Sequence, residues 1–90
     1  MTAEASGAKH LANNFIAATA IVWDLSQLRE NVVIGENCII GRNVYIGPGV
    51  VIGNNCKIQN NALIYEPAVL EDGVLMGPDA ILTNDKHPGH

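Results

Sequence analysis

The feature that most constrains the fold of this chain is an aliphatic residue at every sixth position from residue 16 to residue 82. The positions are Ile16, Val22, Leu28, Ile34, Ile40, Ile46, Ile52, Ile58, Ile64, Leu70, Met76 and Leu82. A period of six differs from the 3.6-residue period of an α-helix, and turn residues recur too often for β-hairpins. Such a repeat is typical of a parallel β-helix, in which short strands and tight corners wind into a column.

The other positions of the six-residue repeat favour the same fold. Two residues before each aliphatic position lies a small or modestly apolar residue, which the alternation of side chains along a strand places on the same inner face. Three residues before it lies most often Asn, Gly or Asp, the residues that best tolerate a left-handed backbone at a corner. Three repeats complete a triangular coil, so residues three repeats apart are expected to stack at the strand spacing of about 4.8 Å.

The 90 residues are expected to form one domain with two parts. Residues 1–14 are polar and rich in Ala, and we expect them to be a flexible or capping leader. Residues 15–90 are expected to form an all-β structure, a parallel β-helix of about four triangular coils. The repeat stops in mid-coil at residues 86–90, so we expect the helix to be incomplete at its C-terminal end.

Charge and hydropathy exclude two classes of partner and indicate a location. The net charge is −4 and no basic cluster is present, which argues against nucleic acid. No apolar run approaches the length needed to span a membrane. Because the leader lacks the apolar stretch of a signal peptide, we expect a cytoplasmic protein.

Cysteine and histidine usage indicates that no metal is bound. Cys38 and Cys56 are three repeats apart, so we expect them to stack inside the column as reduced core residues. No CxxC motif is present, which disfavours a zinc site built on cysteines. A β-helical carbonic anhydrase needs histidine ligands on its coils, and residues 11–86 contain no histidine.

The outer positions of the expected strands form apolar ladders. Each residue just before an inward aliphatic residue points outward, and on one face these residues are Phe15, Val33, Val51 and Val69. An apolar ladder on so small a column is a candidate interface, and a three-sided column favours a cyclic homotrimer.

Several stretches resemble one group of hexapeptide-repeat acyltransferases, the N-acetyltransferases of nucleotide-linked 3-amino sugars. The resembling stretches are Val22-Trp23-Asp24, residues 27–31, residues 56–60, Tyr65-Glu66, residues 70–74, Met76-Gly77-Pro78 and residues 82–85. The resemblance implies a left-handed β-helix, acetyl-CoA as co-substrate and acetyl transfer to the sugar amine. It also implies a trimer with sites between neighbouring columns, and surface polysaccharide synthesis as the context. It covers about residues 15–88, the front half of such enzymes.

The candidate site residues lie in the C-terminal part of the repeat region. The resemblance implies that Glu71 and Asn84 are the catalytic pair that binds or orients the amino sugar, and that Asp85 supports the loop. Asn84 follows Glu66 by three repeats and Tyr65 precedes the same corner, so we expect these side chains to converge on one edge with Glu71 and Asp85. Tyr65, Glu66 and Asp85 are therefore expected to bind the substrate.

Two other functions fit the same sequence. A non-catalytic, trimerising β-helix would need only the repeat and the apolar ladders. An acyltransferase that acts on another small amine or alcohol would differ only in its substrate. The residues alone do not decide between these functions and the sugar N-acetyltransferase.

Overall fold

The computed structural model describes residues 13–83, which form twelve strands of two residues each. The strands are β2 (Phe15–Ile16), β3 (Ile21–Val22), β4 (Gln27–Leu28), β5 (Val33–Ile34), β6 (Ile39–Ile40), β7 (Tyr45–Ile46), β8 (Val51–Ile52), β9 (Lys57–Ile58), β10 (Leu63–Ile64), β11 (Val69–Leu70), β12 (Leu75–Met76) and β13 (Ile81–Leu82). Each strand ends on one of the aliphatic residues of the repeat, so the six-residue period sets the strand positions.

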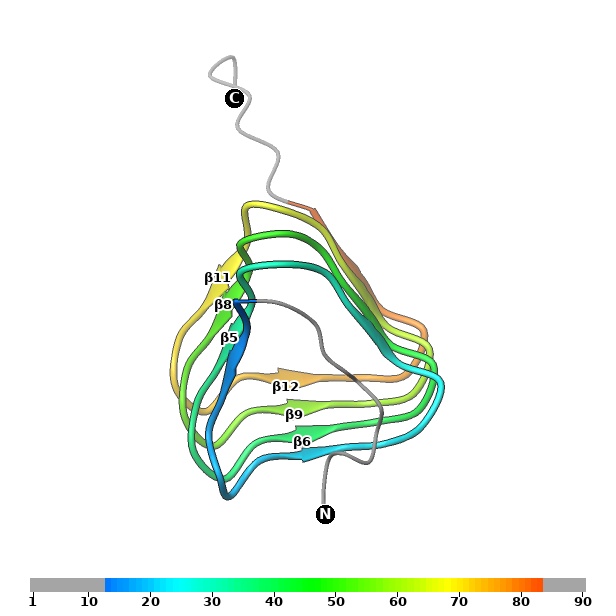
Figure 1. Ribbon diagram of the computed structural model, residues 1–90. Coiled ribbons are helices and arrows are strands. Elements are labelled where there is room, and N and C mark those ends of the chain that lie inside the picture. Colours follow the sequence, from blue (N-terminus) through cyan, green and yellow to red (C-terminus); the bar gives the residue numbers. More distant parts are fainter. Residues whose placement is uncertain (1–12, 84–90) are drawn as a thin grey trace.

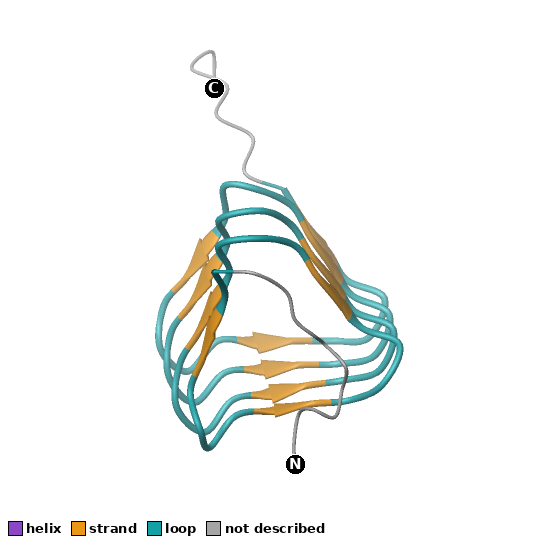
Figure 2. Cartoon of the chain, in the orientation of Figure 1, coloured by secondary structure: helices purple, strands orange, loops and turns teal. Residues whose placement is uncertain are grey.

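The strands form three parallel sheets that make the three sides of a triangular column (Figure 1, Figure 2). The first sheet holds β2, β5, β8 and β11, the second holds β3, β6, β9 and β12, and the third holds β4, β7, β10 and β13. Every pair joins residues one coil apart, as in Ile34 with Ile52 and Leu70 with Ile52. The prediction of a parallel β-helix with about four coils is therefore confirmed.

The second residue of each strand points into the column and builds its core. The central isoleucines, from Ile34 to Ile64 at six-residue intervals, are at most 1% exposed. The small residues two positions earlier, such as Val32 and Ala62, are equally buried. At the two ends of the described column Ile16, Met76 and Leu82 are only partly buried, because no further described coil covers them there.

The corners use the left-handed backbone that the sequence predicts. Asn31, Asn37, Asn43, Gly49, Asn55, Asn61, Gly73 and Asp79 all have φ between 58° and 79°. Pro67 occupies the same position of the repeat and follows a cis peptide bond instead. Leu25 also has a left-handed backbone, with φ of 65°, and among residues 13–83 it is the one apolar side chain held in this conformation. This conformation is costly for a residue with a branched apolar side chain.

Two expectations fall on the ends of the chain. The leader expected over residues 1–14 lies almost wholly outside the described residues, and so does the mid-coil ending at residues 86–90. Within residues 13–83, no helix has the length and apolar character that a membrane crossing requires.

Candidate functional site

The structure places the predicted site residues at two different corners of the column. Tyr65 and Glu66 follow β10, at the corner that leads from the third sheet to the first. Glu71 follows β11, at the next corner, which leads from the first sheet to the second. The expectation that Glu71 shares an edge with Tyr65 and Glu66 is therefore wrong, because residues one repeat apart lie one full side of the triangle apart. Asn84 and Asp85 lie outside the described residues.

At its corner Glu71 is exposed and its carboxylate has no hydrogen bond or ion pair with residues 13–83. Its backbone carbonyl accepts a hydrogen bond from the Cys56 thiol at 3.2 Å. The neighbouring Asp72 differs, because its Oδ1 accepts a hydrogen bond from the Asn54 backbone N–H at 2.7 Å. Asp72 thus stabilises the turn below it, whereas the Glu71 carboxylate is available to a ligand.

Tyr65 belongs to an aromatic group on the third sheet. Its ring lies 5.6 Å from the ring of Tyr45, centroid to centroid, and the side chain is 40% exposed. The Tyr45 hydroxyl accepts a hydrogen bond from Arg29 Nη1 at 3.2 Å, and Arg29 also pairs with Glu30 at 3.2 Å. The hydrogen bond to Tyr45, followed by the charge of Glu30, raises the pKa of Arg29, which stays a cation. A hollow of about 360 Å³ is lined in part by Tyr45, Tyr65 and Leu25.

A second hollow, of about 410 Å³, lies at the end of the second sheet and the corner that follows it. We call it the Trp23 hollow, and it is lined by Trp23, Ile39, Gly41, Arg42, Lys57, Ile58, Gln59 and Asn60. It combines an indole, aliphatic side chains, two cations and two amides. The six-residue pattern does not predict this hollow. The signals for it are a lone Trp in a chain poor in aromatics and a lysine inside an apolar ladder.

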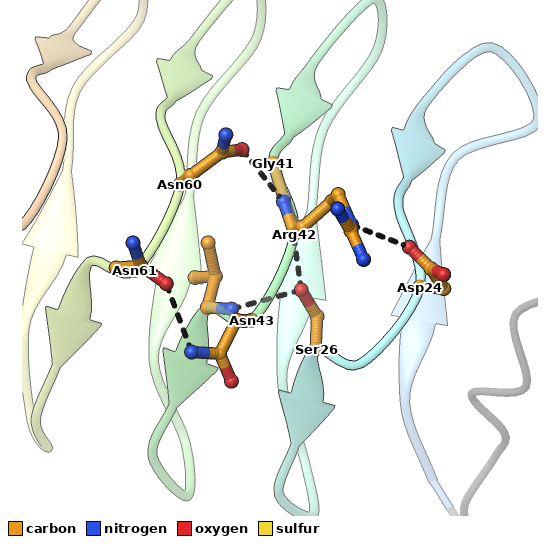
Figure 3. Close-up of polar contacts among 8 residues, drawn as sticks. Asp24, Ser26, Gly41, Arg42, Asn43, Asn60 and Asn61 are labelled. Atoms are coloured by element: carbon orange, nitrogen blue, oxygen red, sulfur yellow. Dashed lines mark hydrogen bonds and ion pairs between the residues drawn. The ribbon is translucent and has the colours of Figure 1, made fainter.

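Polar contacts between successive coils hold the corner beside this hollow (Figure 3). Arg42 Nε pairs with Asp24 Oδ1 at 3.0 Å, in the coil below. The Arg42 backbone N–H donates to Asn60 Oδ1 at 2.9 Å, in the coil above. At the same corner Asn43 Nδ2 donates to Asn61 Oδ1 at 2.8 Å. Arg42 is therefore fixed from both sides, while its side chain remains 56% exposed.

Ser26 adds a further contact on the inner side of this corner (Figure 3). Its hydroxyl donates to the Gly41 carbonyl at 2.7 Å and accepts from the Val44 backbone N–H at 3.0 Å. Most residues at this position of the repeat are Val, Cys or Ala, and Ser26 satisfies two backbone groups that Val or Ala would leave to other partners. Asn14, at the same position of the repeat, likewise accepts the Val32 backbone N–H at 2.9 Å. The corner therefore offers a rigid backbone beside the hollow.

The two cysteines are core residues, as predicted. Both thiols are free and buried, and Cys38 donates to the Gly53 carbonyl at 3.0 Å. Burial raises the pKa of the Cys38 thiol, so it stays protonated near neutral pH and is a poor nucleophile. No group of three or more potential metal ligands occurs among residues 13–83.

Comparison with protein families gives two matches, both over the column. Residues 31–66 match the hexapeptide repeat of succinyl-transferase, and residues 49–84 match the bacterial transferase hexapeptide of six repeats. A search of curated proteins finds no significant match. The two ranges overlap and together extend from β5 to β13, where successive coils pair in the constant register described above. From β5 to β13 the column is thus similar to the hexapeptide repeats of bacterial transferases.

Proposed function

We propose that this chain is the β-helical part of an N-acetyltransferase that moves an acetyl group from acetyl-CoA to the amine of a nucleotide-linked amino sugar. The observation that carries the proposal is the match to transferase repeats over residues 31–84. Within that range the Glu71 carboxylate is exposed and has no partner among residues 13–83. Glu71 lies in the stretch 70–74 that resembles the sugar N-acetyltransferases. The proposal therefore joins a family match to one chemically available group.

The reaction requires little covalent chemistry from the protein, because the bonds that form and break belong to the two substrates. The amine nitrogen attacks the thioester carbonyl, a C–N bond forms, the C–S bond breaks, and the thiol of CoA leaves with a proton. Before or during attack the amine must lose a proton, and a carboxylate within hydrogen-bond reach can accept or orient it. We propose that Glu71 has this role. Asn84 follows β13 in the sequence and by the repeat belongs to another corner, so it would contribute its side-chain carbonyl from a neighbouring column of the trimer. Holding the amine against the thioester supplies much of the rate.

A homotrimer is part of the proposal, supported by the outer side of the first sheet. Phe15 and Val69 are 61% and 67% exposed there, and Val51 is 36% exposed. Together with Val33 they form one stacked apolar ladder along the column. A second copy that packs against this ladder would remove it from water and place one copy's Glu71 corner, at the end of the first sheet, beside a neighbour.

The test of the proposed function is release of the CoA thiol from acetyl-CoA in the presence of a nucleotide-linked amino sugar. Glu71→Gln is expected to lower turnover about 10²-fold with little change in melting temperature, because an exposed corner carboxylate adds little to packing. Glu30→Gln is the matched control, since Glu30 is also an exposed carboxylate at a corner. Asn84→Ala is expected to lower turnover in the same way.

Two results would decide against the proposal. Native turnover in both Glu71→Gln and Asn84→Ala would remove these residues from the mechanism. Absence of transfer to any nucleotide-linked amino sugar, combined with a stable trimer in light scattering, would favour the non-catalytic structural β-helix. In the trimer assay Val51→Lys is expected to weaken association, because it places a charge in an apolar contact.

A further inference from the structure

Lys57 interrupts the apolar ladder on the second sheet. The outward residues of this sheet are Ile21, Ile39, Lys57 and Leu75, and Lys57 lies in register between Ile39 and Leu75. Within residues 13–83 its ammonium group has no ion pair or hydrogen bond, whereas Arg29 and Arg42 each pair with a carboxylate. In a chain of net charge −4, one unpaired cation on an apolar surface marks a place for an anionic group.

Beside Lys57, the column of residues that begins the corner has no side chain directly above Trp23. Trp23, Gly41 and Gln59 occupy the same position in three successive coils and stack there. Gly41 has no side chain, and a Cβ there would collide with Asn60 Oδ1 and lie 2.9 Å from the Asn60 backbone nitrogen. Asn60 instead folds against the Gly41 backbone, where its Oδ1 accepts the Arg42 backbone N–H. The Trp23 indole therefore has no side chain of its own column stacked directly above it.

The indole borders the Trp23 hollow and is open to solvent. Trp23 is 53% exposed, and it lines the hollow together with Ile39, Lys57 and Arg42. An aromatic side chain is a platform for a nucleic-acid base of any type, because every base has a π-face. Lysine and arginine beside it are the side chains that bind phosphate oxygens. The Arg42 guanidinium is partly neutralised by Asp24, so Lys57 supplies most of the attraction for an anion.

We infer that the Trp23 hollow binds the nucleoside diphosphate group of a ligand. The base lies against Trp23, and the phosphates face Lys57 and Arg42. The Gln59 amide and the amide nitrogen of Asn60 are available to the polar edges of the ligand. The choice of ligand rests on the proposed function, whose two substrates both carry this group. The nucleotide-linked sugar and acetyl-CoA are therefore the two possible sources of one ligand chemistry.

The single tryptophan makes the site directly measurable. Because Trp23 is the only Trp of the chain, its fluorescence reports this hollow alone. The 90-residue chain is titrated separately with UDP, ADP and CoA, and calorimetry repeats each titration without relying on the indole. We expect a saturable change in fluorescence. Lys57→Gln is expected to raise the Kd about tenfold or more, because it removes a charged contact to phosphate.

Arg29→Gln is the matched control for charge. Arg29 is an exposed cation on the third sheet with no part in the hollow, so its loss lowers the net charge equally and should leave the Kd within about twofold. Binding of UDP in preference to ADP and CoA would assign the hollow to the sugar nucleotide. Binding of ADP and CoA in preference to UDP would assign it to acetyl-CoA.

Two outcomes of the titrations would overturn the inference. One is no heat and no fluorescence change with any of the three ligands at millimolar concentration. The other is a Kd in Lys57→Gln equal to that of the native chain. Binding at the hollow without acetyl transfer would leave the inference standing and count against the proposed function. Acetyl transfer whose KM values for both substrates are unchanged in Lys57→Gln would overturn the inference alone.

Discussion

The inner and outer residues of the same two-residue strands differ in how strictly they repeat. Inside, one strand after another presents an isoleucine or a close relative, and from Ile34 to Ile64 these side chains are almost fully buried. Outside, the adjacent positions hold residues as different as Phe15, Gln27, Tyr45 and Lys57. The inner position must fill a cross-section that is the same in every coil, whereas the outer position meets only solvent or a partner.

The same contrast appears among the corner glycines. At Gly35, Gly41 and Gly53 a Cβ would collide with a side-chain oxygen of the coil above, whereas at Gly77 it would meet nothing within 4 Å. Gly77 lies where no described coil covers it. A repeated residue can thus be required by packing in one coil and free in another. Residues that break the outer pattern without a packing reason are the better indicators of function.

The largest expected effect comes from placing a charge on the inner side. Ile40→Asp is expected to destabilise the chain by about 4 kcal/mol or more, because Ile40 is fully buried and an unpaired carboxylate is costly there. Ile39→Asp is the matched control, since Ile39 is its neighbour in β6 and is 37% exposed. Thermal unfolding followed by circular dichroism measures both. Equal melting temperatures in the two variants would contradict the assignment of inner and outer residues.

The next effect tests the corner glycines. Gly53→Ala is expected to cost about 1–3 kcal/mol, because the new Cβ would collide with Asp72 Oδ1 and lie 2.9 Å from its backbone nitrogen. Gly77→Ala is expected to change the free energy of unfolding by less than about 0.5 kcal/mol. Chemical denaturation of the two variants gives the comparison. A larger loss at Gly77 would show that a further coil packs over that corner.

A gain of stability is expected at Leu25. This exposed leucine holds a left-handed backbone at the position where most other corners have Asn, so Leu25→Asn should stabilise the chain by about 1 kcal/mol. The reverse change, Asn55→Leu, should cost about the same amount, because Asn55 has a similar φ of 61°. If Leu25→Asn lowers the melting temperature instead, the leucine makes a contact that stabilises the folded protein.

The smallest effect on stability is expected at Lys57. Lys57→Gln should change the free energy of unfolding by no more than about 0.5 kcal/mol, because the side chain is exposed and unpaired within residues 13–83. Thermal unfolding measures it on the same variant that is used for ligand titration. A loss clearly above that limit would make Lys57 a structural residue and would weaken the contrast between the two sides of the strands.

The six-residue period was enough to predict the fold, because it specifies the strands, the coils and the corners. The six-residue repeat sets the strand positions, three repeats make a coil, and the left-handed corners follow from Asn, Gly and Asp at one position of the repeat. The stacked, reduced cysteines follow from the same three-repeat spacing. Periodic burial gives a strong signal in the sequence, because every repeat must place an apolar residue at the same inner position.

Tertiary structure alone decided which surface residues meet. Glu71 and Tyr65 are close in sequence and were predicted to share an edge, yet one side of the triangle separates their corners. Trp23, Gly41 and Lys57 are spread over three coils and line one hollow. The physical reason is that the chain returns to the same side of the triangle once per coil. Residues in different coils therefore become neighbours by stacking. The residue types on the outer surface follow no period, so only the assembled coils show which of these side chains lie together.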